Sequence, residues 1–231
     1  MECDLCLAKA SAFAFAVGLL VLLCALDSSG QRRADFCRIT QQHFLCQQRE
    51  PSPNCGQVYQ RGISRQLAQD LVHVHNVMRS RVARGLVDGQ GGGGKLPQAA
   101  DMLELTNIAT FSTSQRGVEN FHQKVLDLAQ TWIAESVYAS VDFVNTFDQG
   151  CCHTGTYGHF AQAVWSITRY IGCGVVTHQG GLGTKVLLYC NYGPGGIVVS
   201  KPTYRMGRTC SACPQGTKCD SRYDGLCNVA S

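Results

Sequence analysis

The segment from Gly158 to Trp165 (GHFAQAVW) places one histidine, His159, at the start of a short apolar element. A neutral imidazole is a good metal ligand and can carry a proton near neutral pH. The competing interpretation is a structural histidine at the edge of the core, with its ring nitrogens bonded to the backbone. His159 is therefore a candidate for metal binding or for proton transfer.

Glu135 follows Trp132 by three residues, at the edge of an apolar stripe. A carboxylate at such an edge either reaches out to water or points into a cleft. One glutamate and one histidine together can support general acid–base chemistry.

Two cysteines lie near the middle of two segments rich in Val, Ile, Leu and Tyr, which predict strands over residues 170–177 and 185–191. A glycine-rich loop over residues 178–184 would join them as a hairpin. Neighbouring strands lie about 4.8 Å apart, and this distance suits a disulfide bond between Cys173 and Cys190.

Four further cysteines fall in a C-terminal segment that has few aliphatic side chains: Cys210, Cys213, Cys219 and Cys227. Such a segment cannot form a core of its own and needs disulfide bonds to stay folded. A four-cysteine zinc site is the alternative, since Cys-x-x-Cys is a common half of one. An oxidising setting favours two disulfides.

Residues 1–30 are typical of a secretory signal peptide. Lys9 precedes an apolar stretch over residues 10–26, and Ser28-Ser29-Gly30 supplies small residues for cleavage. A membrane anchor is the alternative, but the stretch is at the short limit of about 17–25 residues for crossing a bilayer. We expect a secreted, extracellular protein without a stable membrane anchor.

The composition is that of one medium domain with small extensions, because 45% of the 231 residues are hydrophobic and 16% are charged. The net charge of +4 is spread along the chain and gives no case for nucleic-acid binding.

The cysteine count is odd once the signal peptide is removed, because three of the fourteen cysteines lie within it. At least one thiol must then stay free or join a disulfide-linked dimer. We expect it among five cysteines whose pairing the sequence leaves open: Cys37, Cys46, Cys55, Cys151 and Cys152.

A thiol-protease interpretation would join Cys151 or Cys152 to His153 or His159. Cysteines in secreted chains usually oxidise, and no protease signature surrounds these. The chain also has no Gly-x-Ser-x-Gly motif. We therefore expect that the protein is not an enzyme.

Two amphipathic helices should support these residues. Ser64 can cap a helix whose apolar residues recur at helical spacing until Gly85: Leu67, Leu71, Val74, Met78 and Val82. A second helix is predicted over residues 118–139, with Phe121, Val125, Leu128 and Trp132 on one face. Residues 89–94 are a glycine-rich loop.

Four segments resemble the CAP superfamily, which includes cysteine-rich secretory proteins, antigen 5 venom allergens and plant pathogenesis-related proteins. They are residues 74–85, 96–105, 158–174 and 189–195, the last reading YCNYGPG. The chain is most like arthropod venom allergen 5-like proteins, and the resemblance covers Cys37 to Cys227 with gaps. It implies an α+β fold, the CAP-type α-β-α sandwich.

One part of the family pattern is missing. Family members continue after the position of Leu105 with an acidic helix, a cysteine and a histidine, whereas this chain passes directly to Asn107. The sandwich should therefore be incomplete. The resemblance also implies a cavity with two histidines and two acidic residues that bind a divalent metal. Only Glu135 and His159 match those positions, and His75 is not one of them, so we expect weak metal binding and no cofactor.

The expected organisation is a signal peptide (1–30), a disulfide-tied arm (31–60), a CAP domain (61–207) and a cysteine-rich, hinge-like tail (208–231). The expected function is that of a binding or effector protein of saliva, venom or haemolymph, acting without catalysis on a host protein or a small apolar, lipid- or sterol-like ligand. The alternatives are a metal-dependent extracellular hydrolase or protease, and a non-functional splice product.

Overall fold

The computed structural model describes residues 53–90, 94–109, 118–148, 157–181 and 183–229. The expected signal peptide, most of the arm, and Cys151, Cys152 and His153 lie outside these residues. Within them, no helix is long and apolar enough to span a bilayer.

The longest helix, α3 (Arg65–Ala83), begins and ends where the sequence predicts. The Ser64 side chain accepts a hydrogen bond from the Leu67 backbone N–H across 3.1 Å, so it caps the first turn. Gly85 has a φ of +68°, a conformation that glycine adopts without strain and that ends the helix. Val74 differs from the rest of the predicted stripe because it is only half-buried.

The central hairpin consists of β3 (Tyr170–Gly180) and β4 (Gly183–Gly193), which pair without interruption along their whole length. The prediction of a loop over residues 178–184 is wrong, because His178 pairs with Lys185 and Gly180 pairs with Gly183. The glycines that suggested a loop instead allow a tight turn. Both strands are therefore longer than predicted.

The disulfide bond between Cys173 and Cys190 is confirmed. The two residues are direct partners in the register of β3 and β4, and their Cα atoms are 4.1 Å apart.

Strand β3 is central in the sheet. It pairs with β4 on one edge, and on the other with β1 (Val58–Arg61), which is antiparallel, and β2 (Thr106–Ala109), which is parallel. The chain enters β2 directly from Leu105, whose backbone N–H and C=O both bond to the Asn76 side chain at 2.8 and 2.9 Å. Helix α3 thus holds the point in the chain at which the resemblance implies a missing segment.

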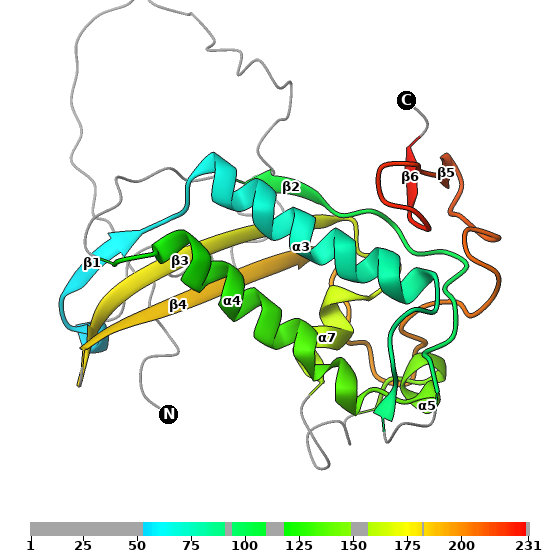
Figure 1. Ribbon diagram of the computed structural model, residues 1–231, viewed down its shortest axis with the longest axis horizontal. Helices are drawn as coiled ribbons and strands as arrows, with labels where there is room; N and C mark the ends of the chain where they lie inside the picture. Colours follow the sequence, from blue (N-terminus) through cyan, green and yellow to red (C-terminus); the bar gives the residue numbers. More distant parts are fainter. Residues whose placement is uncertain (1–52, 91–93, 110–117, 149–156, 182, 230–231) are drawn as a thin grey trace, which may run out of the picture.

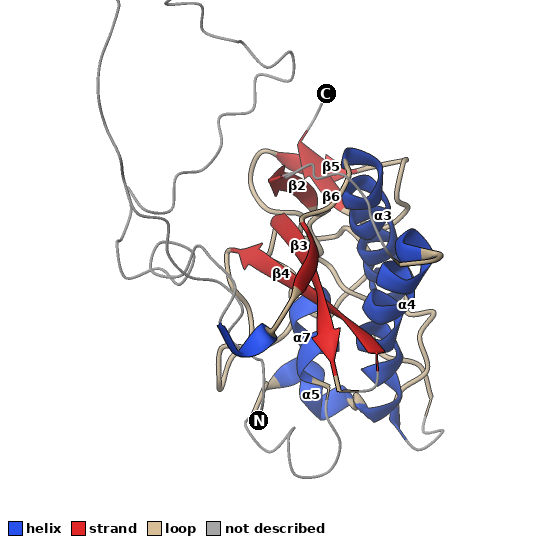
Figure 2. Ribbon diagram, turned by 90° about the vertical axis from the view of Figure 1, so that its left-hand side faces the viewer, coloured by secondary structure: helices blue, strands red, loops and turns tan. Residues whose placement is uncertain are grey.

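Helix α4 (Phe121–Ala134) lies beside α3, and both cover the same face of the hairpin (Figures 1 and 2). The predicted helix over residues 118–139 is correct in type but too long. It begins after Asn120, which has a φ of +54°, and it gives way to a 3-10 turn, η3 (Glu135–Tyr138). In the described ranges only α3 and α4 exceed six residues, so the sandwich has one long-helix layer.

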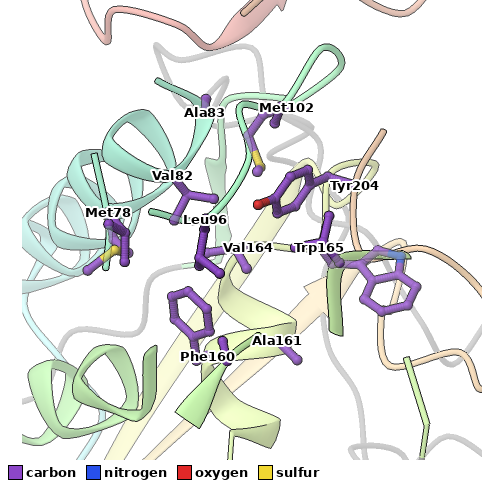
Figure 3. Close-up of a cluster of buried hydrophobic side chains, with 14 of the residues drawn as sticks. Met78, Val82, Ala83, Leu96, Met102, Phe160, Ala161, Val164, Trp165 and Tyr204 are labelled. Carbon is purple, nitrogen blue, oxygen red and sulfur yellow. The ribbon is translucent and has the colours of Figure 1, made fainter. Parts of the chain in front are cut away.

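A second core lies at the other end of the molecule, around the short helices α5 (Val141–Asn145) and α7 (Gly158–Ala163) (Figure 3). Phe160, Val164, Trp165 and Tyr204 are at most 3% exposed there. The two cores bury apolar side chains from α3, α4, α5, α7, β3 and β4, and this burial is the main source of folding stability.

Arg79 fixes the segments between these cores, a role that the sequence analysis did not predict. The guanidinium is fully buried and donates six hydrogen bonds of 2.6–3.1 Å to five backbone carbonyl oxygens: Leu103, Ala163, Trp165, Ser166 and Thr168. The planar fork of an arginine is suited to such divergent acceptors.

The sequence predicts two disulfides in the C-terminal tail without giving their pairing, and the structure joins Cys210 to Cys219 and Cys213 to Cys227. It contains a short hairpin of β5 (Thr217–Cys219) and β6 (Cys227–Val229), beside the C-terminal half of α3 (Figure 1). Leu226 and Cys227 are fully buried. The tail therefore packs into the domain core.

Candidate functional site

Two short elements bring the two candidate residues together. Glu135 is the first residue of η3, at the end of α4, and His159 lies in the first turn of α7. They are 24 positions apart in the sequence, yet Glu135 Oε1 lies 2.7 Å from His159 Nδ1.

The other carboxylate oxygen is also occupied, since Glu135 Oε2 accepts a hydrogen bond of 3.0 Å from the Phe160 backbone N–H. The imidazole of His159 stacks on the indole of Trp132, with ring centroids 5.4 Å apart and planes 9° from parallel. The glutamate is held by α7 and the histidine by α4, so neither side chain turns freely.

Exposure differs sharply within this pair. The Glu135 side chain is 13% exposed, whereas that of His159 is 61% exposed. Because the carboxylate accepts, Nδ1 carries the proton in the neutral ring and Nε2 has the free lone pair. Within the described ranges, Nε2 of His159 makes no hydrogen bond. The arrangement presents one oriented imidazole nitrogen to solvent.

A catalytic zinc site usually has three protein ligands and one open position. Glu135 and His159 supply two donors, and in the described part of the chain no third His, Cys, Asp or Glu forms a metal-binding group with them. These residues alone do not fit such a site.

Two histidines of the long helices, His75 on α3 and His122 on α4, have other partners. His75 is buried, with Nδ1 bonded to the Leu71 carbonyl at 2.7 Å and Nε2 to the Tyr192 hydroxyl at 2.9 Å. Burial lowers the pKa of His75 from 6.5 to about 4, so the ring is neutral near pH 7. His122 pairs with Asp70 between α4 and α3, 2.8 Å apart. Neither lies with His159.

A groove of about 490 Å³ runs between α3 and α4, and the sequence did not predict it. Its apolar lining comes from Val74, Val77 and Met78 on α3 and from Ile133 on α4. The only sequence signal was Val77, an apolar residue off the buried stripe that is 40% exposed. The α4 side ends at Ala134 and Ser136, the two neighbours of Glu135.

Polar residues also line this groove. His73 and Arg81 belong to its lining on α3, and Gln130 to that on α4. His73 Nδ1 is also 2.9 Å from the Tyr223 hydroxyl, so the tail meets the groove. An apolar floor with a few polar groups is the usual make-up of a small-molecule site.

Comparison with known proteins identifies the family. The chain is 31% identical over 196 residues to Scoloptoxin SSD976 of Scolopendra dehaani, covering 73% of this chain and 87% of that protein. It is 30% identical over 230 residues to the CRISP/Allergen/PR-1 protein of Trittame loki, covering 84% of this chain and 55% of that protein. The chain belongs to the CAP superfamily.

A cysteine-rich venom protein of Tityus serrulatus is 33% identical over 184 residues, 69% of this chain. The CAP chain spans only 45% of that relative's length. No family model matches the chain.

Solved structures agree with this assignment. The crystal structure of Na-ASP-1 matches 72% of the CAP chain with a TM-score of 0.58 and 27% identity, over 48% of its own length. The structure of NaASP2 with Zn2+ matches 72% of the chain with a TM-score of 0.57, at 24% identity. The expected α+β, CAP-type fold is confirmed.

Proposed function

We propose that this CAP protein is a secreted binding protein that acts without catalysis, and that the groove between α3 and α4 holds a small apolar ligand. The observation that carries the proposal is the apolar lining of that groove, which is open to solvent beside Val77. Its volume of about 490 Å³ lies within the roughly 300–1,000 Å³ that is usual for ligand sites.

The lining favours a ligand with an acidic end, because it includes Arg81 and His73. An arginine binds a carboxylate through two parallel hydrogen bonds. A lipid-like carboxylic acid suits this lining, because its chain can contact the apolar side chains and its carboxylate can pair with Arg81.

An extracellular setting is supported by the disulfides. The three that join described residues are Cys173–Cys190, Cys210–Cys219 and Cys213–Cys227, and Cys55 is disulfide-bonded as well. Such bonds form in oxidising compartments. Relatives named as venom proteins are consistent with secretion. A host protein as the partner stays a second possibility within this proposal.

The test is displacement of a fluorescent fatty-acid probe from the purified protein. Val77→Glu places a charge on the exposed part of the groove wall. A bound probe would cover this charge and leave it unpaired, so probe binding should weaken at least about tenfold. Val198→Glu is the matched control, because Val198 is 46% exposed and does not line the groove. Equal affinities in both variants would contradict the groove as the site.

A metal-dependent hydrolase is the second candidate, favoured by the outward-facing Nε2 of His159. A relative of this fold has been solved with Zn2+. The two donors present here argue for weak metal binding and against catalysis. Hydrolysis of protein or ester substrates that zinc restores after chelation, and that His159→Ala abolishes, would establish this candidate instead.

A further inference from the structure

The two disulfide bonds of the tail lie against each other. The sulfur atoms of Cys210, Cys213 and Cys227 are all within 4.8 Å of one another, and Cys219 is not part of this cluster. One sulfur of the Cys210–Cys219 bond is thus next to both sulfurs of the Cys213–Cys227 bond. A metal would need these cysteines as thiolates, but all of them are disulfide-bonded.

Exposure to solvent is graded across these two bonds. Cys219 is exposed, Cys210 and Cys213 are half-buried, and Cys227 is fully buried. A thiol in solution therefore meets the Cys219 sulfur first. Access of the attacking thiolate is one of the factors that set the rate of disulfide exchange.

We propose that the tail is a thiol–disulfide exchange site, in which a small external thiol attacks Cys219 and Cys210 passes the exchange on to the Cys213–Cys227 bond. In the first step an external thiolate forms a bond to the Cys219 sulfur. The Cys210–Cys219 bond breaks, and its electron pair leaves on Cys210 as a thiolate.

In the second step the Cys210 thiolate attacks the Cys227 sulfur. A Cys210–Cys227 bond forms, the Cys213–Cys227 bond breaks, and Cys213 leaves as the thiolate. Cys213 is the better leaving sulfur because it is half-buried, whereas a thiolate at buried Cys227 would be poorly solvated. The external thiol ends on Cys219, and no net oxidation takes place.

The hydrogen bonds that hold the tail can survive this exchange. The Cys227 N–H donates to the Met102 carbonyl at 2.7 Å, and the Cys227 carbonyl accepts from the Glu104 N–H at 2.9 Å. These bonds keep the Cys227 backbone on the domain while its sulfur changes partner. The product is a folded protein with a covalent modification at Cys219 and a reactive thiol at Cys213.

Two substitutions that remove the same disulfide bond test this relay. Cys219→Ser leaves a thiol at Cys210, inside the sulfur cluster, whereas Cys210→Ser leaves a thiol at Cys219, outside it. Each protein is alkylated under native conditions and cleaved with trypsin. Fragment ions then locate the alkyl group within peptide 209–218, which contains both Cys210 and Cys213.

We expect the label of Cys219→Ser to be divided between Cys210 and Cys213, with at least about ten times more label on Cys213 than in Cys210→Ser. In Cys210→Ser the label among tail cysteines should stay on Cys219. The wild-type protein treated with glutathione should carry glutathione on Cys219 and label on Cys213. Label confined to Cys210 in Cys219→Ser, or equal labelling of Cys213 in both variants, would overturn the proposal.

Discussion

Glu135 and His159 form a hydrogen bond of 2.7 Å between the end of α4 and the first turn of α7. The bond orients the imidazole so that Nε2 faces solvent. The same carboxylate accepts from the Phe160 backbone, so the pair also ties two elements of the fold. The pair therefore has a structural role in addition to any role in binding.

Zinc binding by this pair should be weak. Two protein donors fall short of the three of a usual catalytic zinc site, so we expect a Kd above about 10 µM by calorimetry on the purified protein. His159→Ala should abolish the residual binding at the pair. Micromolar or tighter binding that His159→Ala removes would mean that the site is more complete than the described residues indicate. Tight binding that survives His159→Ala would point to the cysteines of the tail.

Replacing Arg79 should destabilise the protein severely. Arg79→Met removes the guanidinium donors from five carbonyl oxygens, of which only those of Trp165 and Ser166 keep a backbone N–H donor. It should lower the free energy of unfolding by at least about 3 kcal/mol. Arg79→Lys should recover only part of this loss, because an ammonium lacks the planar fork. Arg81→Met on the exposed side of α3 is the control and should change stability little. Urea denaturation gives all three values, and similar losses for Arg79→Met and Arg81→Met would refute the role of Arg79.

Acid should destabilise the protein through His75. Its pKa is about 4 in the folded state and 6.5 in the unfolded chain. Below pH 6.5 the unfolded chain therefore binds a proton that the folded chain does not. The free energy of unfolding should therefore fall by up to roughly 1.4 kcal/mol per pH unit between pH 6.5 and 4. Burial is the main cause; the nearby Arg79 charge acts in the same direction, and the bond to Leu71 opposes it.

The measurement for His75 is urea denaturation at several pH values in this window. His75→Gln should flatten the pH dependence whatever it does to stability at pH 7. Ser80→Ala is the control on the same helix, because it removes a hydrogen bond of 2.6 Å to the Asp224 carbonyl but no titrating group. It should keep the slope of the wild type, and an unchanged slope in His75→Gln would show that another group titrates.

Glu104 should hold the tail to the domain. Its side chain is 2% exposed, pairs with Arg222 and accepts from Asn228 at 3.0 Å, both residues of the tail. Glu104→Ala should lower the free energy of unfolding by about 2 kcal/mol and speed amide exchange over residues 217–229. Lys95→Ala breaks the exposed pair with Asp88 and should do neither. Unchanged exchange in Glu104→Ala would mean that the contacts of this side chain do not hold the tail.

Much of this fold could be predicted from local patterns in the sequence. The apolar spacing in α3, the Ser64 cap and the strand pairing of Cys173 with Cys190 depend on neighbouring residues, and the structure confirms them. The hairpin loop was placed wrongly because glycines next to Gly181 extend the strands as well as turning them.

Contacts between residues far apart in the chain could not be predicted from the sequence. Arg79 bonds to carbonyls up to 89 positions away, and backbone acceptors leave no mark on the sequence. The groove depends on how α3 and α4 pack side by side. Glu135 and His159 were chosen from the family pattern, and their contact follows from the placement of η3 against α7.

Photo-crosslinking with a diazirine fatty acid tests the binding proposal most directly, because it reports the place of the ligand without any substitution. After irradiation and proteolysis, the label should lie within residues 73–81 and 130–136, the two ranges that contain the residues lining the groove. Unlabelled fatty acid in excess should suppress it. Label found elsewhere on the chain, or spread evenly over exposed residues, would contradict the groove as the ligand site.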